Sequence, residues 1–239
     1  MSTQTPITPS KKLFIILGAG ASVDSGLPTY RGTVGLYSNS NTNPEDVLCP
    51  ETLYLKPDGC KEIWKFLKPL YGLISNSQPG PTYLTLKALV EHVPDSFILT
   101  QNIDGFAKSV TDNVVEMHGN WKTMRCIKCN HISPVDLDKY YCYCGGLCRP
   151  NIVLFGETLS KDDVQLVYTN IKWNVSHVLV IGTTLQFPYL REFIGAAKSR
   201  GAKVIHINPD EGYSENVMQR ETWIKMPACE GLLSLNLIS

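Results

Sequence analysis

The stretch LFIILGAGASVDSG, residues 13–26, predicts a buried strand, a glycine-rich turn and the start of a helix. A short apolar run next to a glycine is a signal for a core strand. Backbone amides at the following turn, together with the helix dipole, suit the binding of a pyrophosphate. The usual dinucleotide fingerprint GxGxxG is incomplete, because Gly18 and Gly20 are present but Val23 takes the third position. Taken alone, the turn fits either a phosphate site or a tight strand-to-helix connection.

Further short apolar runs alternate along the chain with helix-length stretches of periodic hydrophobicity. The expected strands are Leu13–Leu17, Ser96–Thr100, Val114–Met117, His177–Gly182 and Lys203–Asn208. The expected helices are Lys61–Ile74, Thr82–His92, Lys161–Trp173 and Tyr189–Arg200. Strands that alternate with helices indicate parallel βαβ units, so the predicted fold class is α/β, with a Rossmann-like, doubly wound parallel sheet.

Polar motifs follow each of these strands directly. They are GAGAS after the first strand, TQNID (100–104) and HG (118–119) after the next two, and GTT (182–184) and NPD (208–210) after the last two. Open α/β sheets bind ligands outside the carboxyl ends of their strands. Asp104 alone is explained as well by a helix cap, and a single histidine is more often structural than catalytic. Of the five histidines, however, only His118 ends a strand beside a glycine, and imidazole suits general-base work near neutral pH.

Composition excludes several classes of protein. The chain has 239 residues, 43% of them hydrophobic, and its 22 basic and 22 acidic residues balance. This balance argues against a direct nucleic-acid binder, which needs a basic excess, and leaves room for a peptide substrate. No apolar run is long enough for a membrane span, and the polar residues 1–12 read as a disordered tail without a signal peptide. An intracellular, cytoplasmic and reducing location is therefore expected, with cysteines as thiols or metal ligands.

Two segments interrupt the strand–helix alternation. Residues 32–60 are rich in Gly, Asn, Ser and Pro, and a loop of this length is usually functional. Residues 120–149 hold five of the eight cysteines, in the spacing of two thiolate pairs that a tetrahedral zinc ion requires. Four thiolates leave no open coordination position, so one structural zinc is expected. The ligands chosen from the spacing, with Cys148 as an alternative, are Cys126, Cys129, Cys142 and Cys144.

Several of these motifs together resemble the sirtuin family. GAGASVDSGLPTYRG is similar to the opening motif of sirtuins, TQNID and HG match their central motifs, and YCYCGGLCRPNIVLFGE is similar to the end of their zinc ribbon and substrate strand. The resemblance runs from Leu13 to Asn208. It implies an NAD-dependent protein lysine deacetylase or deacylase, which transfers the acyl group to ADP-ribose and releases nicotinamide. The implied partner is a protein or peptide carrying an acylated lysine.

The resemblance also assigns roles to individual positions. It implies that His118 is the catalytic base, that Asn102 orients ribose or water, and that Val153 and Phe155, with Ile103, hold the acylated lysine. A neutral acyl-lysine can enter such an apolar tunnel, whereas a charged ammonium loses its hydration there without compensation. The residues implied in NAD binding are Gly18, Ala19, Gly20, Ser22, Tyr30, Arg31, Gln101, Asn102, Ile103, Asp104, Gly182, Thr183, Thr184 and Asn208.

The sequence departs from the family pattern at several points. Tyr141 stands where the family usually has a zinc-binding cysteine, Cys148 replaces a common leucine, and Tyr83 replaces a histidine. The segment LQFPYL after GTT is shorter than the family's LxVxP pattern. Sirtuins that remove acidic acyl groups resemble one another in a Tyr-x-x-Arg pair, where this chain has Leu67 and Leu70. Short neutral acyl groups, acetyl first, are therefore the expected substrates.

The expected organisation is one catalytic domain, residues 13–239. Its Rossmann-like core comprises residues 13–31, 81–119 and 150–239. The cofactor loop and helical segment (32–80) and the zinc module (120–149) form a smaller lobe, with the active cleft between the lobes. Two alternatives remain open: a mono-ADP-ribosyltransferase or NAD hydrolase that uses the same pocket, and a catalytically inactive NAD-binding or zinc-ribbon interaction module.

Overall fold

The computed structural model describes residues 12–29, 43–172 and 175–235, and these build a six-stranded parallel sheet. The strand order is β3-β2-β1-β7-β8-β9. The strands are β1 (Lys12–Leu17), β2 (Phe97–Thr100), β3 (Val114–Glu116), β7 (Val175–Ile181), β8 (Lys203–Ile207) and β9 (Thr222–Ile224). The order reverses between β1 and β7, which is the topological switch point of a Rossmann-type sheet and the place where such sheets bind ligands.

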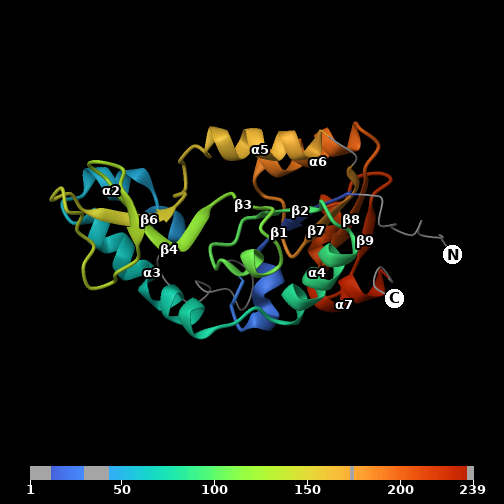
Figure 1. The fold of residues 1–239 in the computed structure, drawn as a ribbon, viewed down its shortest axis with the longest axis horizontal. Helices are drawn as coiled ribbons and strands as arrows, with labels where there is room; N and C mark the ends of the chain where they lie inside the picture. Colours follow the sequence, from blue (N-terminus) through green and yellow to red (C-terminus); the bar gives the residue numbers. More distant parts are fainter. Residues whose placement is uncertain (1–11, 30–42, 173–174, 236–239) are drawn as a thin grey trace.

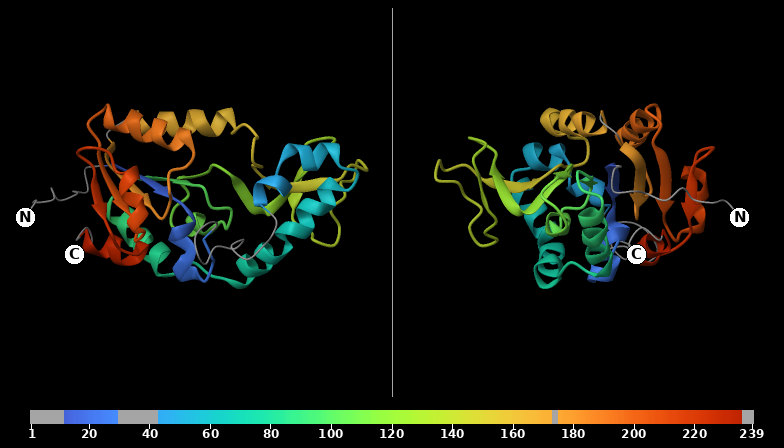
Figure 2. Two further views of the ribbon diagram at one scale, coloured as in Figure 1. Left: turned by 180° about the vertical axis from the view of Figure 1, so that it is seen from behind. Right: turned by 45° about the vertical axis from the view of Figure 1, so that its right-hand side comes forward.

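Helices cover both faces of the sheet, as the continuous apolar run in β1 requires. Leu13, Ile15 and Leu17 point to the face covered by α4 (Pro81–His92) and α7 (Ala228–Ser234). Phe14 and Ile16 point to the opposite face, covered by α5 (Lys161–Ile171) and α6 (Pro188–Lys198). Figures 1 and 2 show these two helical layers on either side of the strands. All five residues are fully buried, so the parallel sheet predicted from the sequence is confirmed.

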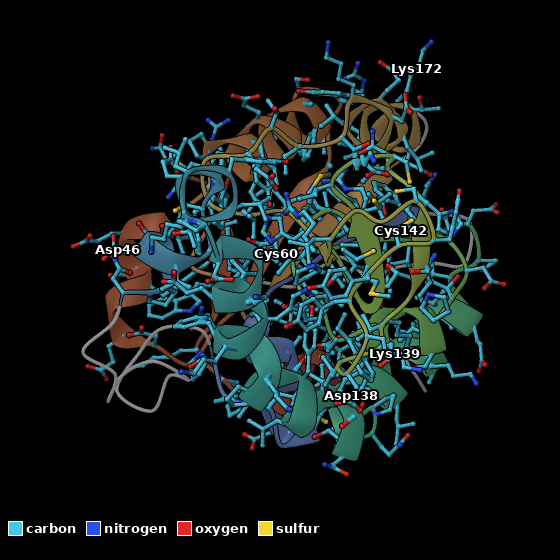
Figure 3. All side chains as sticks on the ribbon, turned by 90° about the vertical axis from the view of Figure 1, so that its left-hand side faces the viewer. Asp46, Cys60, Asp138, Lys139, Cys142 and Lys172 are labelled. Atoms are coloured by element: carbon cyan, nitrogen blue, oxygen red, sulfur yellow. The ribbon has the colours of Figure 1, made fainter. Side chains whose placement is uncertain are left out.

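A smaller lobe lies at one end of the molecule (Figure 1). Its antiparallel sheet, in the order β5-β4-β6, consists of β4 (Gly119–Cys126), β5 (Ile132–Pro134) and β6 (Cys148–Ile152). Helices α2 (Pro50–Leu55) and α3 (Gly59–Asn76) complete the lobe, and Trp64 of α3 donates a hydrogen bond of 2.7 Å from Nε1 to the carbonyl of Cys148. Figure 3 views this lobe end-on, with Cys60 of α3 and Cys142 of the cysteine-rich segment labelled.

The local structure differs from the sequence prediction in three places. The described part of the expected loop at 32–60 contains α1 (Pro44–Val47) and α2, each with a proline in its first turn, where the missing N–H has no helical partner to lose. The turns after β1 and β2 lead into the 3₁₀ helices η1 (Ala19–Ser25) and η2 (Phe106–Ser109), not into α-helices. A further 3₁₀ helix, η3 (Glu211–Asn216), lies between β8 and β9.

Helix α3 continues through Pro69 without a break. None of the helices in residues 12–29, 43–172 and 175–235 is long and apolar enough to cross a bilayer.

Candidate active site

The loops after β1 and β7 cross each other at the switch point, and glycines make the crossing possible. The amide of Gly18 donates to the carbonyl of Ile181 (3.0 Å), and the amide of Gly20 donates to that of Gly182 (2.9 Å). A Cβ on Gly20 would lie 2.6 Å from the Cα of Gly182, which itself has a φ of +61°. The amides of Gly18 and Gly20 are thus used within the protein. The amide of Ala19 begins η1 and has no helical partner, so it can bind a ligand.

The imidazole of His118 is fixed by a hydrogen bond from each ring nitrogen. Its Nδ1 lies 3.0 Å from the carbonyl oxygen of Gln101. A carbonyl only accepts, so Nδ1 carries the proton and Nε2 is the basic nitrogen of the neutral ring. Burial lowers the pKa of His118 to about 4, although the Gln101 carbonyl acts in the opposite direction. At neutral pH the ring is therefore an uncharged proton acceptor.

Four polar side chains form a buried cluster beside this histidine, and they come from η1, α4 and the TQNID segment. Ser22 Oγ lies 2.7 Å from both Tyr83 Oη and Asp104 Oδ2. The Nδ2 of Asn102 donates to the carbonyl of Gly18 (3.0 Å) and to Ser22 Oγ (3.1 Å). Burial raises the pKa of Asp104, against the hydrogen bonds from Ser22 and from the amide of Phe106. The cluster joins the loop after β1 to the TQNID segment by hydrogen bonds.

The remaining polar residues of the motifs meet at the same edge of the sheet. Gln101 donates from Nε2 to Thr183 Oγ1 (2.8 Å), while its own carbonyl holds His118. Asn208 donates from Nδ2 to the carbonyl of Thr183 (3.3 Å). Thr184, in contrast, is exposed. The motifs after β1, β2, β7 and β8 are therefore joined by hydrogen bonds, as the parallel sheet predicts.

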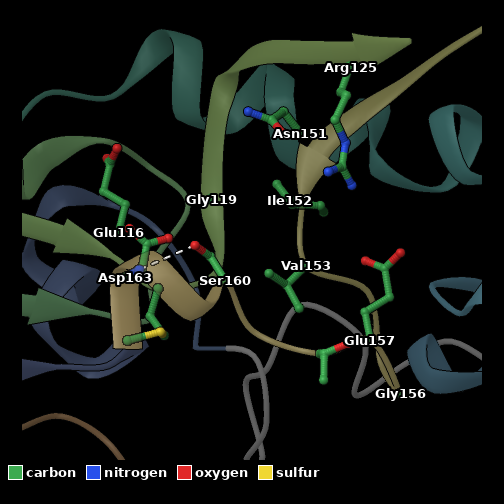
Figure 4. Close-up of a pocket in the computed structure, with 12 residues that line it drawn as sticks. Glu116, Gly119, Arg125, Asn151, Ile152, Val153, Gly156, Glu157, Ser160 and Asp163 are labelled. Carbon is green, nitrogen blue, oxygen red and sulfur yellow. Dashed lines mark hydrogen bonds between the residues drawn. The ribbon is translucent and has the colours of Figure 1, made fainter. Parts of the chain in front are cut away.

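A pocket of about 400 Å³ lies between the end of β3, strand β6 and the start of α5. Val153 projects into its centre, with Arg125 and Glu157 on one side and Ser160 and Asp163 on the other (Figure 4). The amide of Val153 donates to the carbonyl of His118 (2.9 Å). This bond brings the segment after β6 next to the histidine, and only the carbonyl of Val153 remains to bind an amide N–H. Phe155 does not line this pocket; it packs against the core cluster that also includes Ile103.

A buried ion pair shapes the turn that follows β6. The guanidinium of Arg149 is bound at both terminal nitrogens by the carboxylate of Glu157, with 2.9 Å between Nη2 and Oε2. Arg149 also donates to the carbonyl of Ile152 (2.7 Å). The amide of Leu154 donates to the same carboxylate oxygen, Glu157 Oε2 (2.8 Å). In the motif RPNIVLFGE, the guanidinium of Arg149 is therefore bound by groups of the same segment. These bonds hold the backbone on both sides of Val153.

The structure brings together four cysteines of the small lobe. The sulfur atoms of Cys126, Cys129, Cys142 and Cys144 all lie within 4.8 Å of one another. Sulfur atoms around a tetrahedral zinc with Zn–S bonds of about 2.3 Å are separated by about 3.8 Å. The amides of Lys128 and Cys129 donate to Cys126 Sγ (3.4 and 3.5 Å), which supports a thiolate. Donor type and spacing fit one structural zinc ion.

Cys148 is not part of this cluster, although it pairs with Cys126 across the strands β4 and β6. It is buried under α3, and its carbonyl accepts the hydrogen bond of Trp64. Gly146 is packed against the metal site, since a Cβ there would lie 2.8 Å from Cys126 Sγ. The geometry therefore favours the four ligands chosen from the cysteine spacing over the alternative that included Cys148.

Three residues at the site were given no role by the sequence reasoning. Tyr83 was noticed only as a departure from the family pattern, and its hydroxyl turns out to belong to the polar cluster around Ser22. The hydroxyl of Tyr189 donates to His118 Nε2 at 2.8 Å, and the shortened LQFPYL segment was the one sequence signal of a local change. The third residue, Arg149, belongs to a motif that was used for its apolar positions. Tyr30 and Arg31, both expected to contact NAD, lie outside the described residues.

Comparisons with known proteins agree with this arrangement. The chain is 33% identical over 214 residues to NAD-dependent protein deacylase 2 of Pseudomonas aeruginosa, which covers 84% of this chain and 82% of that protein. It is 34% identical over 204 residues to the NAD-dependent protein deacylase of Aquifex aeolicus, covering 82% of each. The crystal structure of a Sir2 homolog–NAD complex superposes with a TM-score of 0.78 and 26% identity, covering 95% of this chain and 89% of that one.

The family model described as Sir2 family matches residues 18–188, from the first glycine of the crossing loops to the start of α6. This range contains Ser22, the TQNID segment, His118 and the cysteine cluster. With relatives of similar length at more than 30% identity, the chain belongs to the Sir2 family, the sirtuins.

Proposed function

We propose that the protein is an NAD-dependent protein lysine deacetylase, with His118 as its general base. The observation that carries the proposal is the state of His118: Nδ1 is held by the carbonyl of Gln101, Nε2 is basic, and burial keeps the ring neutral. A neutral imidazole next to a cluster of ribose-binding polar groups can take a proton from a sugar hydroxyl. The NAD-dependent deacylases to which the chain is similar support the same chemistry.

The residues at the switch point fit NAD as the co-substrate. When bound, NAD supplies the ribose carbon that accepts the acyl oxygen and nicotinamide as the leaving group. The first amide of η1, at Ala19, supports a diphosphate near the crossing loops, as do the glycines Gly18 and Gly20 that shape them. Gln101 and Asn102 face the ribose, Asp104 orients the nicotinamide amide, and Thr183, Thr184 and Asn208 lie beside the adenosine. Among the described residues, Ser22, Ile103 and Gly182 complete the proposed cofactor site.

The acylated lysine is proposed to enter beside the segment that follows β6. The carbonyl of Val153 accepts the N–H of the acyl-lysine amide, because the amide of Val153 is already bonded to His118. Phe155 and Ile103, which pack against the same core cluster, provide apolar contacts for the lysine stem. The pocket in Figure 4 continues from Val153 towards α5 and offers room for the residues that flank the lysine.

A reducing compartment, the cytoplasm, is proposed as the location. Four cysteines in zinc-binding geometry support it, because zinc-bound thiolates must remain reduced. The balance of 22 basic and 22 acidic residues supports a protein or peptide partner over direct binding to nucleic acid.

The decisive experiment measures nicotinamide release from NAD in the presence and in the absence of an acetylated peptide. Where the peptide is present, deacetylation of its lysine is measured as well. The proposed function predicts nicotinamide release that depends on the acetyl group. Release without a peptide indicates an NAD hydrolase, and transfer of ADP-ribose to protein indicates the ribosyltransferase alternative. If neither peptide nor NAD is consumed although NAD binds, the chain is an inactive NAD-binding module.

Two histidine variants make this experiment specific. His118→Ala is expected to lose about 10²- to 10⁴-fold in rate while it still binds NAD, because a positioned base contributes that much. His92→Ala is the matched control, since His92 is exposed at the end of α4, and its rate is expected to equal that of the wild type. Near-normal turnover by His118→Ala contradicts the proposed role.

A further inference from the structure

The basic nitrogen of His118 already has a hydrogen-bond partner inside the protein. The hydroxyl of Tyr189 lies 2.8 Å from Nε2. Because Nδ1 carries the proton of the neutral ring, Nε2 can only accept, and the phenol must donate. Burial raises the pKa of Tyr189, so the phenol keeps its proton. The hydroxyl of Tyr189 is therefore the donor of this hydrogen bond, and Nε2 of His118 is the acceptor.

Tyr189 is held in this position by aromatic packing. It is the second residue of α6, directly after Pro188, and its ring contacts Phe187 and Phe193 with centroids 5.9 Å away in each case. Phe187 also packs edge-on against His118, at 5.4 Å between centroids. Phe187 and Tyr189 follow the loop after β7, in which Leu185 adopts a φ of +53°. The loop after β7 and the start of α6 thus cover the side of the imidazole from which a substrate hydroxyl must approach.

The groups in direct contact with the imidazole of His118 are uncharged. These are the Gln101 carbonyl after β2, the phenol of Tyr189 and the ring of Phe187. The nearby carboxylates are engaged elsewhere: Glu116 of β3 accepts from Asn120, and Asp104 accepts from Ser22 and Phe106. The hydrogen bond from Tyr189 therefore acts on His118 without competition from an adjacent charge.

We propose that Tyr189 caps the general base: in the NAD-free protein its hydroxyl occupies the proton-accepting nitrogen of His118, and a ribose hydroxyl must replace it before that nitrogen can take a proton. The inference rests on the function proposed for His118. It makes Tyr189 a positioning residue, which keeps the imidazole neutral and correctly rotated until the co-substrate arrives. The cap also reduces the affinity for NAD, because binding has to break a hydrogen bond.

The variant Tyr189→Phe removes the hydroxyl and keeps the ring that packs on Phe187 and Phe193. Loss of a bond donated to the neutral imidazole raises the pKa of His118, by up to about one pH unit for a typical hydrogen bond. The same change is expected to tighten NAD binding by about 2- to 10-fold. Tyr168→Phe is the matched control, since Tyr168 packs on the same Phe193 from α5, at 5.0 Å, and does not contact His118.

The experiment follows the imidazole of His118 by nuclear magnetic resonance during a pH titration, assigned with His118→Ala, and measures the Kd of NAD by calorimetry. A higher pKa of His118 and a lower Kd in Tyr189→Phe, with neither change in Tyr168→Phe, support the cap. An unchanged or lower pKa, or weaker NAD binding, overturns it. Neither readout depends on turnover. Absence of deacetylation by the wild type, with both readouts as expected, contradicts the proposed function alone.

Discussion

Arg149 and Glu157 form an ion pair at the turn that follows β6, and the side chain of Arg149 is only 1% exposed. Burial alone raises the pKa of Glu157, but the hydrogen bond and charge of Arg149 and the amide of Leu154 outweigh it, so the pKa is lowered overall. Arg149→Ala leaves this carboxylate with the amide of Leu154 as its remaining donor, and it removes the guanidinium from the carbonyl of Ile152. We expect a loss of about 3–5 kcal/mol in the free energy of unfolding, measured by urea denaturation at pH 7.

Arg200→Ala is the control for this variant, because Arg200 is exposed at the end of α6. A surface substitution of this kind is expected to change the free energy of unfolding by less than about 0.5 kcal/mol. Equal effects of the two variants would show that the buried ion pair does not hold the turn at Glu157.

The cysteine cluster predicts one zinc ion per molecule. Metal analysis of the purified protein is expected to find one equivalent, and Cys129→Ser is expected to lose it. Chelation should unfold the β4–β6 sheet and reduce activity indirectly, because structural zinc supplies folding free energy. Cys148→Ser is the matched control, which keeps the metal because Cys148 lies outside the cluster. A protein that retains zinc in Cys129→Ser and loses it in Cys148→Ser has a different ligand set.

The crossing of the loops after β1 and β7 predicts that Gly20 tolerates no side chain. A Cβ there would lie 2.6 Å from the Cα of Gly182, so one loop has to move. We expect Gly20→Ala to weaken NAD binding at least tenfold and to lower stability, with calorimetry and thermal denaturation as the measurements. Gly72→Ala tests the specificity of this effect: nothing lies within 4 Å of its Cβ, and alanine in a helix stabilises by about 0.5–1 kcal/mol.

Protonation of His118 predicts a pH-dependent stability. Burial lowers the pKa of the folded state to about 4, while the unfolded chain titrates near 6.5. Since the unfolded state binds the proton first, this contribution to stability is complete above about pH 6.5. It is lost as the pH falls from about 6.5 through about 4, at up to about 1.4 kcal/mol per pH unit.

The measurement compares the wild type with His118→Gln in urea denaturation between pH 7 and pH 4.5. Carboxyls whose pKa is raised by desolvation, such as those of Asp104 and Glu116, act in the opposite direction, but they are present in both proteins and cancel in the comparison. The wild type should lose more stability than the variant over this range. Parallel curves for the two proteins contradict a lowered pKa of His118 in the folded protein.

The residues on α3 predict an acyl preference. Leu67 and Leu70 stand where sirtuins that remove acidic acyl groups resemble one another in a Tyr-x-x-Arg pair. Leu67 is 1% exposed and belongs to the core, whereas Leu70 is partly buried against the same cluster. The nearby cation Lys68 is exposed to solvent. Helix α3 does not end at Pro69 but continues to Asn76. We therefore expect kcat/KM on one peptide to be higher for acetyl than for succinyl lysine, because burying an unpaired carboxylate costs about several kcal/mol.

Myristoyl lysine on the same peptide measures how far the apolar surface extends. Each methylene that is buried adds at best about 0.8 kcal/mol to binding. A preference for succinyl over acetyl lysine would show that a cation reaches the acyl group and that the predicted preference for neutral acyl groups is wrong.

The sequence by itself determined the parallel sheet and the residues that gather at its edge. The run Leu13–Leu17 has no polar face and is followed by a glycine, which favours a core strand, and β1 is buried accordingly. Motifs that follow parallel strands must meet at one edge, which is why Gln101, Thr183 and Asn208 could be grouped before their contacts were known. The zinc ligands followed from local spacing, since a short β-ribbon holds nearby cysteines close together.

Only the tertiary structure decided what those residues contact. The bond between Tyr189 and His118 joins positions 71 residues apart, and neither periodicity nor spacing specifies such a pair. The short strand β9 and helix α7 were not expected, because three to seven residues carry too little periodic signal. The need for glycine at Gly20 arises from its approach to Gly182, a contact set by the packing of two distant loops. Local sequence fixes backbone preference and burial, whereas hydrogen-bond partners across the site depend on how the elements pack.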